Sequence, residues 1–146
     1  MSTVKKILKK RQQVRQFSKA RVPELENITR LINLTYELVA SKQSLVPYKI
    51  TILGTHNTDE KQELYELSRK NTGGAGNTNI LAPYVLCFQN RLIVNPNPSV
   101  KRKMAKGHIY DMCNPEKYKL KGMEVGIEVG MFAKILTTLC LENDID

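Results

Sequence analysis

Basic side chains are the residues best placed to do chemistry in this sequence, because they gather at one end of the chain. The first 21 residues carry eight lysines or arginines and no acid, whereas residues 122–146 carry five acids and one lysine. The eight are Lys5, Lys6, Lys9, Lys10, Arg11, Arg15, Lys19 and Arg21. With a formal net charge of +9, this asymmetry predicts that the basic end meets an anion: a phosphate, a nucleic acid or an acidic protein surface.

Two other groupings give weaker signals. Residues 73–76 read GGAG, but no Gly-Lys-Ser or Gly-Lys-Thr follows, so a P-loop is excluded and a flexible loop is predicted. His108, Asp111 and Cys113 are close in sequence, yet their spacing matches no compact zinc pattern, so no metal site is predicted. No Ser/His/Asp or Cys/His nucleophile set is recognisable either, and we assign no catalytic residue.

The cysteines and the hydropathy pattern indicate the compartment. Cys87, Cys113 and Cys140 form no C-x-x-C pair, and Cys87 and Cys140 lie in apolar runs. We therefore expect buried, reduced thiols in a reducing compartment. No stretch approaches the ~20 apolar residues of a membrane span, and the N-terminus lacks the apolar region of a secretory signal. The sequence thus predicts a soluble, cytoplasmic protein without a membrane partner.

The first half of the chain predicts helices around one strand. Residues 3–12 suggest a short basic helix, and residues 16–22 a connector. Pro23 suits the first position of a helix that ends near Ser41, with Leu25, Ile28, Ile32, Tyr36 and Val39 on its apolar face, widened by Leu31, Leu34 and Leu38. A strand is predicted over 48–53. A second helix, capped by Asp59, should reach about Lys70, and a mobile loop should cover 71–79.

The second half predicts a strand and a long helix. Residues 84–89 form a continuous apolar run, which is typical of a strand buried on both faces. A turn-rich break at 95–99 precedes a basic stretch, 101–121, with only short helical prospects. Residues 122–142 are apolar nearly all round, so they predict a buried central helix, and Gly126 and Gly130 would let another helix approach closely. The order of elements predicts a mixed α/β (α+β) fold with helices around a small, two-stranded sheet.

Three stretches, taken in order, resemble the nitroreductase-like FMN-dependent oxidoreductases. Residues 11–17 (RQQVRQF), followed by Val22-Pro23 and a helix, resemble that family's R-x-S-V-R-x-F opening. Residues 82–86 (APYVL) resemble the strand that the family enters through an Ala-Pro pair, and residues 122–142 resemble its long central helix. The resemblance implies residues 1–21 as a basic helix and connector, and residues 22–146 as an incomplete, truncated nitroreductase-like domain. The family's later strands, flavin-covering loop and late phosphate contacts have no counterpart before Asp146.

The same resemblance implies an FMN site at a homodimer interface formed by the central helices. Arg11 and Arg15 match positions that hold the FMN phosphate and ribityl chain, and an arginine fork suits a phosphate. Gln12 and Gln13 match neighbouring polar contacts. Ser44 stands where the family has the asparagine that contacts the flavin ring, and Val46 stands where it has a glutamine. Flavin chemistry depends on such ring contacts, so these two departures imply weakened or lost FMN binding.

Three functions follow as hypotheses. The first is a nitroreductase-like domain reused as a non-catalytic scaffold or interaction subunit of a larger assembly, such as a virion or tail component, which partners through helix 122–142. The second is an FMN-dependent NAD(P)H oxidoreductase for nitro or quinone acceptors, completed by a second chain. The third, weaker hypothesis is nucleic-acid binding through the basic N-terminus, although residues 5–15 lack interleaved aromatic residues for base stacking.

Overall fold

A computed structural model of the chain describes residues 6, 7, 9, 16, 17, 20–71, 73–120 and 123–145, with backbone only at 42, 123 and 124. Four of the five predicted cofactor-binding residues, Arg11, Gln12, Gln13 and Arg15, lie outside the described residues. Most of the predicted helix 3–12 does so too, although Lys6, Ile7 and Lys9 are described and are helical. Ser44 is therefore the predicted cofactor contact that can be followed in the structure.

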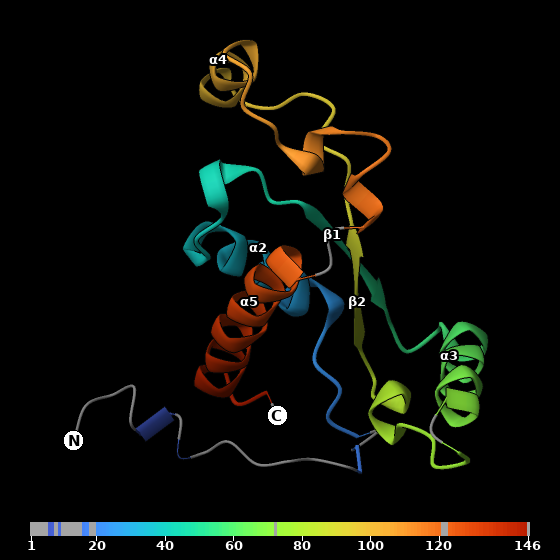
Figure 1. The fold of residues 1–146 in the computed structure, drawn as a ribbon. Helices are drawn as coiled ribbons and strands as arrows, with labels where there is room; N and C mark the ends of the chain where they lie inside the picture. The colour runs from blue at the N-terminus through green and yellow to red at the C-terminus, as the bar shows by residue number, and fades with distance from the viewer. Residues whose placement is uncertain are drawn as a thin grey trace. The chain divides into compact units, whose positions relative to one another are not determined.

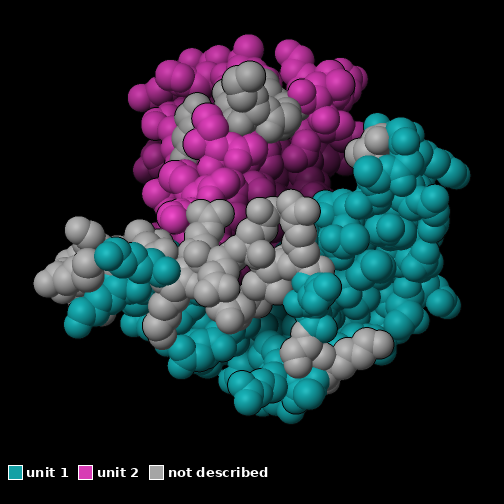
Figure 2. All heavy atoms as spheres, turned by 90° about the horizontal axis from the view of Figure 1, so that it is seen from below, with its two compact units in different colours: residues 1–31, 51–87, 138–146 teal, residues 32–50, 88–137 magenta. Residues whose placement is uncertain are grey.

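The described residues form a mixed α/β fold, as predicted. The helices are α2 (Leu25–Leu38), α3 (Thr58–Asn71), α4 (Pro98–Ala105) and α5 (Met123–Glu142). Strands β1 (Tyr48–Leu53) and β2 (Val85–Asn90) pair in an antiparallel sheet (Figure 1). Short 3₁₀ turns are η1 (Lys42–Ser44), η2 (Thr78–Leu81), η3 (Asp111–Cys113) and η4 (Tyr118–Leu120). The residues group into two compact units, one of 1–31, 51–87 and 138–146 and the other of 32–50 and 88–137 (Figure 2).

Helix α2 forms where the spacing of apolar residues predicted a helix, but it begins later and ends earlier than predicted. The carbonyl of Glu24 accepts the amide protons of Asn27 and Ile28, so Pro23 precedes the helix instead of occupying its first position. The buried face consists of Ile28, Leu31, Ile32, Thr35 and Val39. Leu25 and Leu38 were expected on this face but are 45% and 55% exposed, and the helix ends at Leu38 instead of near Ser41.

An aromatic cluster forms the core of the unit made of 32–50 and 88–137. Tyr36, Tyr48, Phe88 and Phe132 contribute four rings, with centroids 5.0–6.1 Å apart in the recorded pairs. Tyr48 and Phe132 are 1% and 0% exposed. Edge-to-face pairs of this kind add to the free energy gained from burying the rings, so this cluster holds together residues of α2, β1, β2 and α5.

The other unit is tied by polar contacts between distant segments. The hydroxyl of Tyr84 donates to the carbonyl of Pro23 at 2.8 Å. A guanidinium nitrogen of Arg30 donates to the amide oxygen of Asn143 at 3.2 Å. Helix α3 begins at Thr58, so the predicted cap, Asp59, lies inside its first turn.

Two predictions of complete burial are wrong. Strand β2 is only half-buried, and Gln89 on it is exposed, because the described sheet has two strands. Helix α5 buries Val125, Phe132 and Leu141 but leaves Ile127 62% exposed. Its length and place in the sequence were predicted correctly, whereas an apolar composition did not determine which sides are covered. None of the described helices is long and apolar enough to cross a membrane.

Candidate functional site

The predicted flavin contact, Ser44, lies in a loop with an unusual backbone. Gln43, Ser44 and Val46 have φ angles of 58°, 55° and 43°, which is the left-handed region that glycine favours. A β-branched residue such as Val46 is rarely found there. Each such residue costs about 1–3 kcal/mol and persists only where the surroundings enforce it. This loop is therefore a candidate functional segment.

Among the described residues, three side-chain hydrogen bonds hold the loop in this conformation, in addition to the backbone bond from the Ser44 amide to the Ser41 carbonyl at 3.0 Å. The amide of Val46 donates to the hydroxyl of Ser41 at 2.9 Å. The side-chain amide of Asn97 donates to the carbonyl of Gln43 at 2.6 Å, and the hydroxyl of Tyr110 donates to Oε1 of Gln43 at 3.0 Å. All of these residues belong to the same compact unit. The strained loop is thus tied to two segments that follow β2 in the chain.

Asn97 links the loop to the start of α4. Its Oδ1 accepts the amide proton of Val100 at 3.0 Å, which is the geometry of an N-cap, and Pro98 occupies the first turn. An Asn N-cap followed by Pro is a strong helix-start signal. The sequence analysis placed a turn-rich break at 95–99, and the structure shows that this break also opens a helix. Val100, 0% exposed, anchors α4 beside it.

A cavity of about 540 Å³ lies against this loop, within the range usual for small-molecule sites. Ser44, Leu45 and Val46 line one side, and residues 91–97 line the other. Among these lining residues the one charged side chain is Arg91, whose backbone amide donates to the carbonyl of Pro47 at 2.9 Å. The guanidinium of Arg91, the hydroxyl of Ser44 and the side-chain amide of Asn95 together offer donors for a ligand that carries carbonyl or phosphate oxygens.

The pKa of a tyrosine in the aromatic cluster is affected by the positive charge of Arg91. Burial raises the pKa of Tyr36, and the positive charge of Arg91 opposes this rise. Burial also raises the pKa of Tyr48 to about 12, with smaller contributions from Tyr36 and Glu128. Arg91 therefore lies near enough to the core to influence the half-buried Tyr36 while its own side chain remains exposed.

The structure brings Ser44 together with residues that the sequence analysis missed. Asn97 had a detectable signal, the Asn-Pro pair. Arg91 had none, because a single arginine after a strand is an ordinary surface residue. Val46, where the resembled family has a glutamine, lines the same cavity as Ser44. The predicted partners of Ser44 in FMN binding lie outside the described residues, so the structure does not place them beside it.

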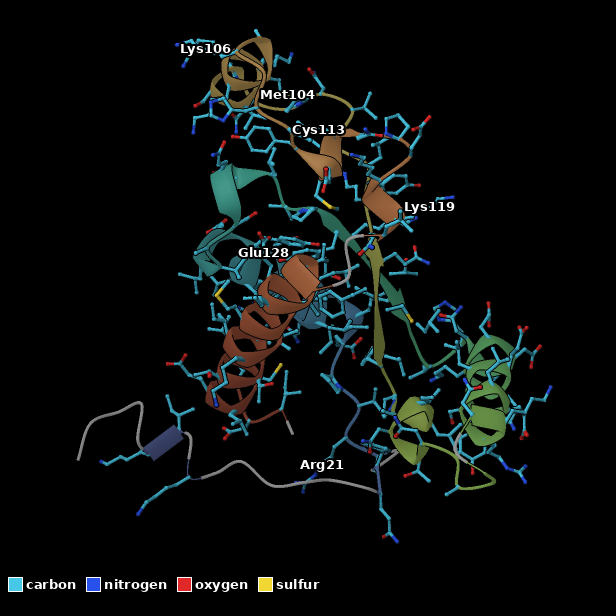
Figure 3. All side chains as sticks on the ribbon, in the orientation of Figure 1. Arg21, Met104, Lys106, Cys113, Lys119 and Glu128 are labelled. Atoms are coloured by element: carbon cyan, nitrogen blue, oxygen red, sulfur yellow. The ribbon has the colours of Figure 1, made fainter. Side chains whose placement is uncertain are left out.

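A second cavity, of about 530 Å³, lies beside α4 and η3. It is lined by Met104, His108, Ile109, Tyr110, Cys113, Asn114, Pro115 and Glu116. Figure 3 labels Met104 of α4 and Cys113 of η3. Burial raises the pKa of the Cys113 thiol, so it is a weak nucleophile at neutral pH. Within the described ranges no three His, Cys, Asp or Glu side chains gather in a group that could hold a metal ion.

The cysteines are less deeply placed than predicted. Cys87, Cys113 and Cys140 are free thiols, and all three are half-buried instead of buried. Burial also raises the pKa of Cys140. The raised pKa values keep the Cys113 and Cys140 thiols protonated at neutral pH, which agrees with a structural part in the packing.

Helix α5 presents an apolar surface that the described chain does not cover. Ile127 and Met131, one turn apart, are 62% and 39% exposed. Gly126 and Gly130 lie next to them, and a Cβ added to either glycine would meet no described atom within 4 Å. We call these four residues the α5 face. The opposite side of the helix packs Val125 and Phe132 into the core.

Comparison of the chain with protein-family models, with curated proteins and with solved structures found no match.

Proposed function

We propose that this chain is a nitroreductase-like protein that works as a protein-interaction subunit and associates with a second copy through the α5 face. The observation that carries the proposal is the exposure of Ile127 and Met131 next to two glycines. Contiguous exposed apolar residues mark interaction sites. Small residues spaced four apart let two helix backbones approach closely.

A second copy is the partner that this face fits. A two-fold axis would bring the same patch of each copy together, so that apolar residues meet apolar residues and each Gly126–Gly130 edge meets its counterpart. The four residues of the face carry no charge, and the exposed Lys134 lies one turn beyond Gly130. The resemblance to a family whose subunits pack through their central helices points the same way.

Sedimentation velocity over a range of protein concentrations tests the association. We expect the wild type to sediment as a dimer or larger species, and Ile127→Glu to shift it to monomer, because two buried carboxylates would face each other without partners. The matched control is Ile109→Glu, since Ile109 is 77% exposed and lies outside the α5 face. A wild type that is monomeric at every concentration, or equal effects of both variants, would overturn the proposal.

FMN binding is the second candidate, and the cavity beside Ser44 favours it. The Ser44 hydroxyl and the Asn95 amide suit the carbonyl and nitrogen edge of a flavin ring, and Arg91 suits a negative charge. Under this second hypothesis, the chain with bound FMN reduces a nitro or quinone acceptor with electrons from NAD(P)H. Arg11 and Arg15 would hold the phosphate, as the resemblance implies.

Flavin fluorescence separates the two candidates. If the chain binds FMN, titration should quench the flavin emission with a saturable curve, and Arg91→Ala should weaken binding about tenfold. Lys49→Ala is the control, because Lys49 is an exposed cation of the same unit that does not line the cavity. A colourless preparation with no saturable quenching discards FMN binding and leaves the interaction function standing.

A further inference from the structure

Lys61 is an unusual residue because, among the described residues of the mostly polar helix α3, this charged side chain is the buried one. It lies in α3 and is 6% exposed. Lysine is almost never buried so deeply unless it is paired. Its ammonium donates to the carbonyls of Ala82 and Pro83, at 3.0 Å and 3.3 Å. These two bonds stabilise the ammonium form, but carbonyl oxygens do not neutralise its charge.

A cavity of about 510 Å³ lies beside this ammonium, in the unit that contains α3. One part of its wall is polar, consisting of Lys61, Thr55, Thr58 and Gln62. The remainder is apolar and is formed by Phe17, Val22, Leu81 and Pro83. The lining residues, as far as the structure describes the chain, include no carboxylate. The cavity therefore joins an uncompensated positive charge to an apolar wall.

The neighbouring acids do not supply the missing negative charge. Asp59 and Glu60 belong to the first turn of α3, but both are exposed and neither lines the cavity. The carboxylate of Glu60 accepts a hydrogen bond from the side chain of Asn57 at 3.2 Å. Its own backbone amide and this bond hold the pKa of Glu60 below its usual value. Glu60 is thus engaged at the helix end.

The remaining donors converge on the cavity. An ammonium has three N–H groups, and in the described part of the chain two of those of Lys61 are used by carbonyls. The hydroxyls of Thr55 and Thr58, which line the cavity, add further donors, whereas the side-chain amide of Gln62 already donates to Oε1 of Glu66 at 3.0 Å. Thr58 opens α3, so the cavity also lies beside the positive end of the helix dipole. Burial lowers the pKa of Lys61 from its ordinary value of 10.5, and a bound anion would reverse that effect.

We infer that this cavity binds a small organic monocarboxylate, with its carboxylate on Lys61, Thr55 and Thr58 and its apolar body against Phe17, Val22 and Leu81. A carboxylate supplies the counter-ion that a buried ammonium requires. An apolar body suits the other wall better than water does. An inorganic phosphate would satisfy the polar wall and leave the apolar one without a partner. This inference does not depend on the α5 face or on FMN.

Titration of the wild-type protein with sodium hexanoate tests the inference, using two-dimensional NMR and calorimetry. We expect saturable shifts confined to residues 55–62 and 81–83, and binding about ten- to a hundredfold tighter than that of hexan-1-ol, which has a similar body and no charge. Inorganic phosphate is the third probe. Binding of phosphate as tight as that of hexanoate, or equal binding of the alcohol, would overturn the organic-anion assignment.

Lysine variants identify the recognising group. Lys61→Met keeps the length of the side chain and should weaken hexanoate binding about ten- to a hundredfold. Lys70→Met makes the same change at an exposed position of the same helix and should alter binding less than about twofold. Should Lys61→Met fail to fold, the comparison of hexanoate with hexan-1-ol on the wild type decides alone. Absence of saturable shifts at concentrations that would reveal a Kd of about 10 mM refutes the site.

Discussion

Removing the buried hydroxyl of Tyr48 is expected to stabilise the protein. Tyr48 is 1% exposed, and its oxygen has no hydrogen-bond partner among the described residues. Its ring packs against Tyr36, Phe88 and Phe132, at centroid distances of 6.1, 5.8 and 6.0 Å. Replacement by Phe keeps this ring packing and removes the oxygen. Tyr48→Phe should therefore stabilise the protein, whereas most buried substitutions destabilise it.

The size of the effect follows from the cost of burying a polar group without a partner. That cost is about 1–3 kcal/mol. Removing the oxygen also leaves a small void, which offsets part of the stability gained. We therefore expect the free energy of unfolding to rise by about 1 kcal/mol. For a chain of this length, such a change corresponds to a rise in Tm of about 2–5 °C.

Tyr84→Phe is the matched control, because the chemical change is the same and the environment differs. The Tyr84 hydroxyl donates to the Pro23 carbonyl at 2.8 Å, and its loss should lower the free energy of unfolding by about 1 kcal/mol. Urea denaturation followed by circular dichroism measures both variants under one protocol. A loss of stability in Tyr48→Phe as large as that in Tyr84→Phe would falsify the argument, since it would mean that the Tyr48 oxygen has a partner.

The same side chain predicts a dependence of stability on alkaline pH. Burial raises the pKa of Tyr48 from 10.0 to about 12 in the folded protein. Between these values the unfolded chain loses its proton first, so the free energy of unfolding falls as pH rises and is unaffected below pH 10. The full loss is about 2.7 kcal/mol. The stability difference between Tyr48→Phe and the wild type should widen by about this amount between pH 9 and 12, and a constant difference would contradict the reasoning.

Three further substitutions test the local geometry by urea denaturation. Asn97→Ala should cost about 1–2 kcal/mol, because it removes the α4 cap and the hydrogen bond to the Gln43 carbonyl; an unchanged free energy of unfolding would show that neither contact matters. Gly76→Ala should cost about 1–3 kcal/mol, because the added Cβ would overlap the Tyr65 ring and lie 2.7 Å from Cγ of Arg69. Gly126→Ala, in a helix with open space around it, should instead stabilise the monomer by about 0.5–1 kcal/mol, and a loss there would mean that the space is filled.

Elements specified by neighbouring residues were predictable from the sequence. The strand over residues 48–53 was located correctly at both ends, and the helix expected to reach about Lys70 runs from Thr58 to Asn71. Both depend on apolar spacing and on the breaks that flank them. Helix α4 was missed because it is short and basic, and among its residues Val100 is the buried one. Its start signal, Asn97-Pro98, was present, but a turn and a helix start share that signal.

Burial was less predictable, because it depends on which segments meet. The composition of residues 122–142 is apolar on all sides, yet Val125, Phe132 and Leu141 are buried while Ile127 is 62% exposed. Lys61 is a buried residue that the sequence pattern did not single out. It lies in the polar sequence TDEKQELYELSRKN, and its burial results from carbonyls 21 and 22 residues further along the chain. Neither the uneven burial of α5 nor the burial of Lys61 can be recognised from the neighbouring sequence.

The Ser44 loop is the case in which distant contacts override local preference. Residues 41–47 contain no glycine or asparagine, the residues that most readily adopt positive φ. The conformation of Gln43 is imposed by Asn97 and Tyr110, which lie 54 and 67 residues away. Since a strained backbone persists only where several contacts agree, removing either contact should relax Gln43 and Ser44 together. The placement of Ser44 on the wall of the cavity is therefore a property of the network and not of the loop sequence, and a motif comparison centred on Ser44 alone could identify the residue but not its geometry.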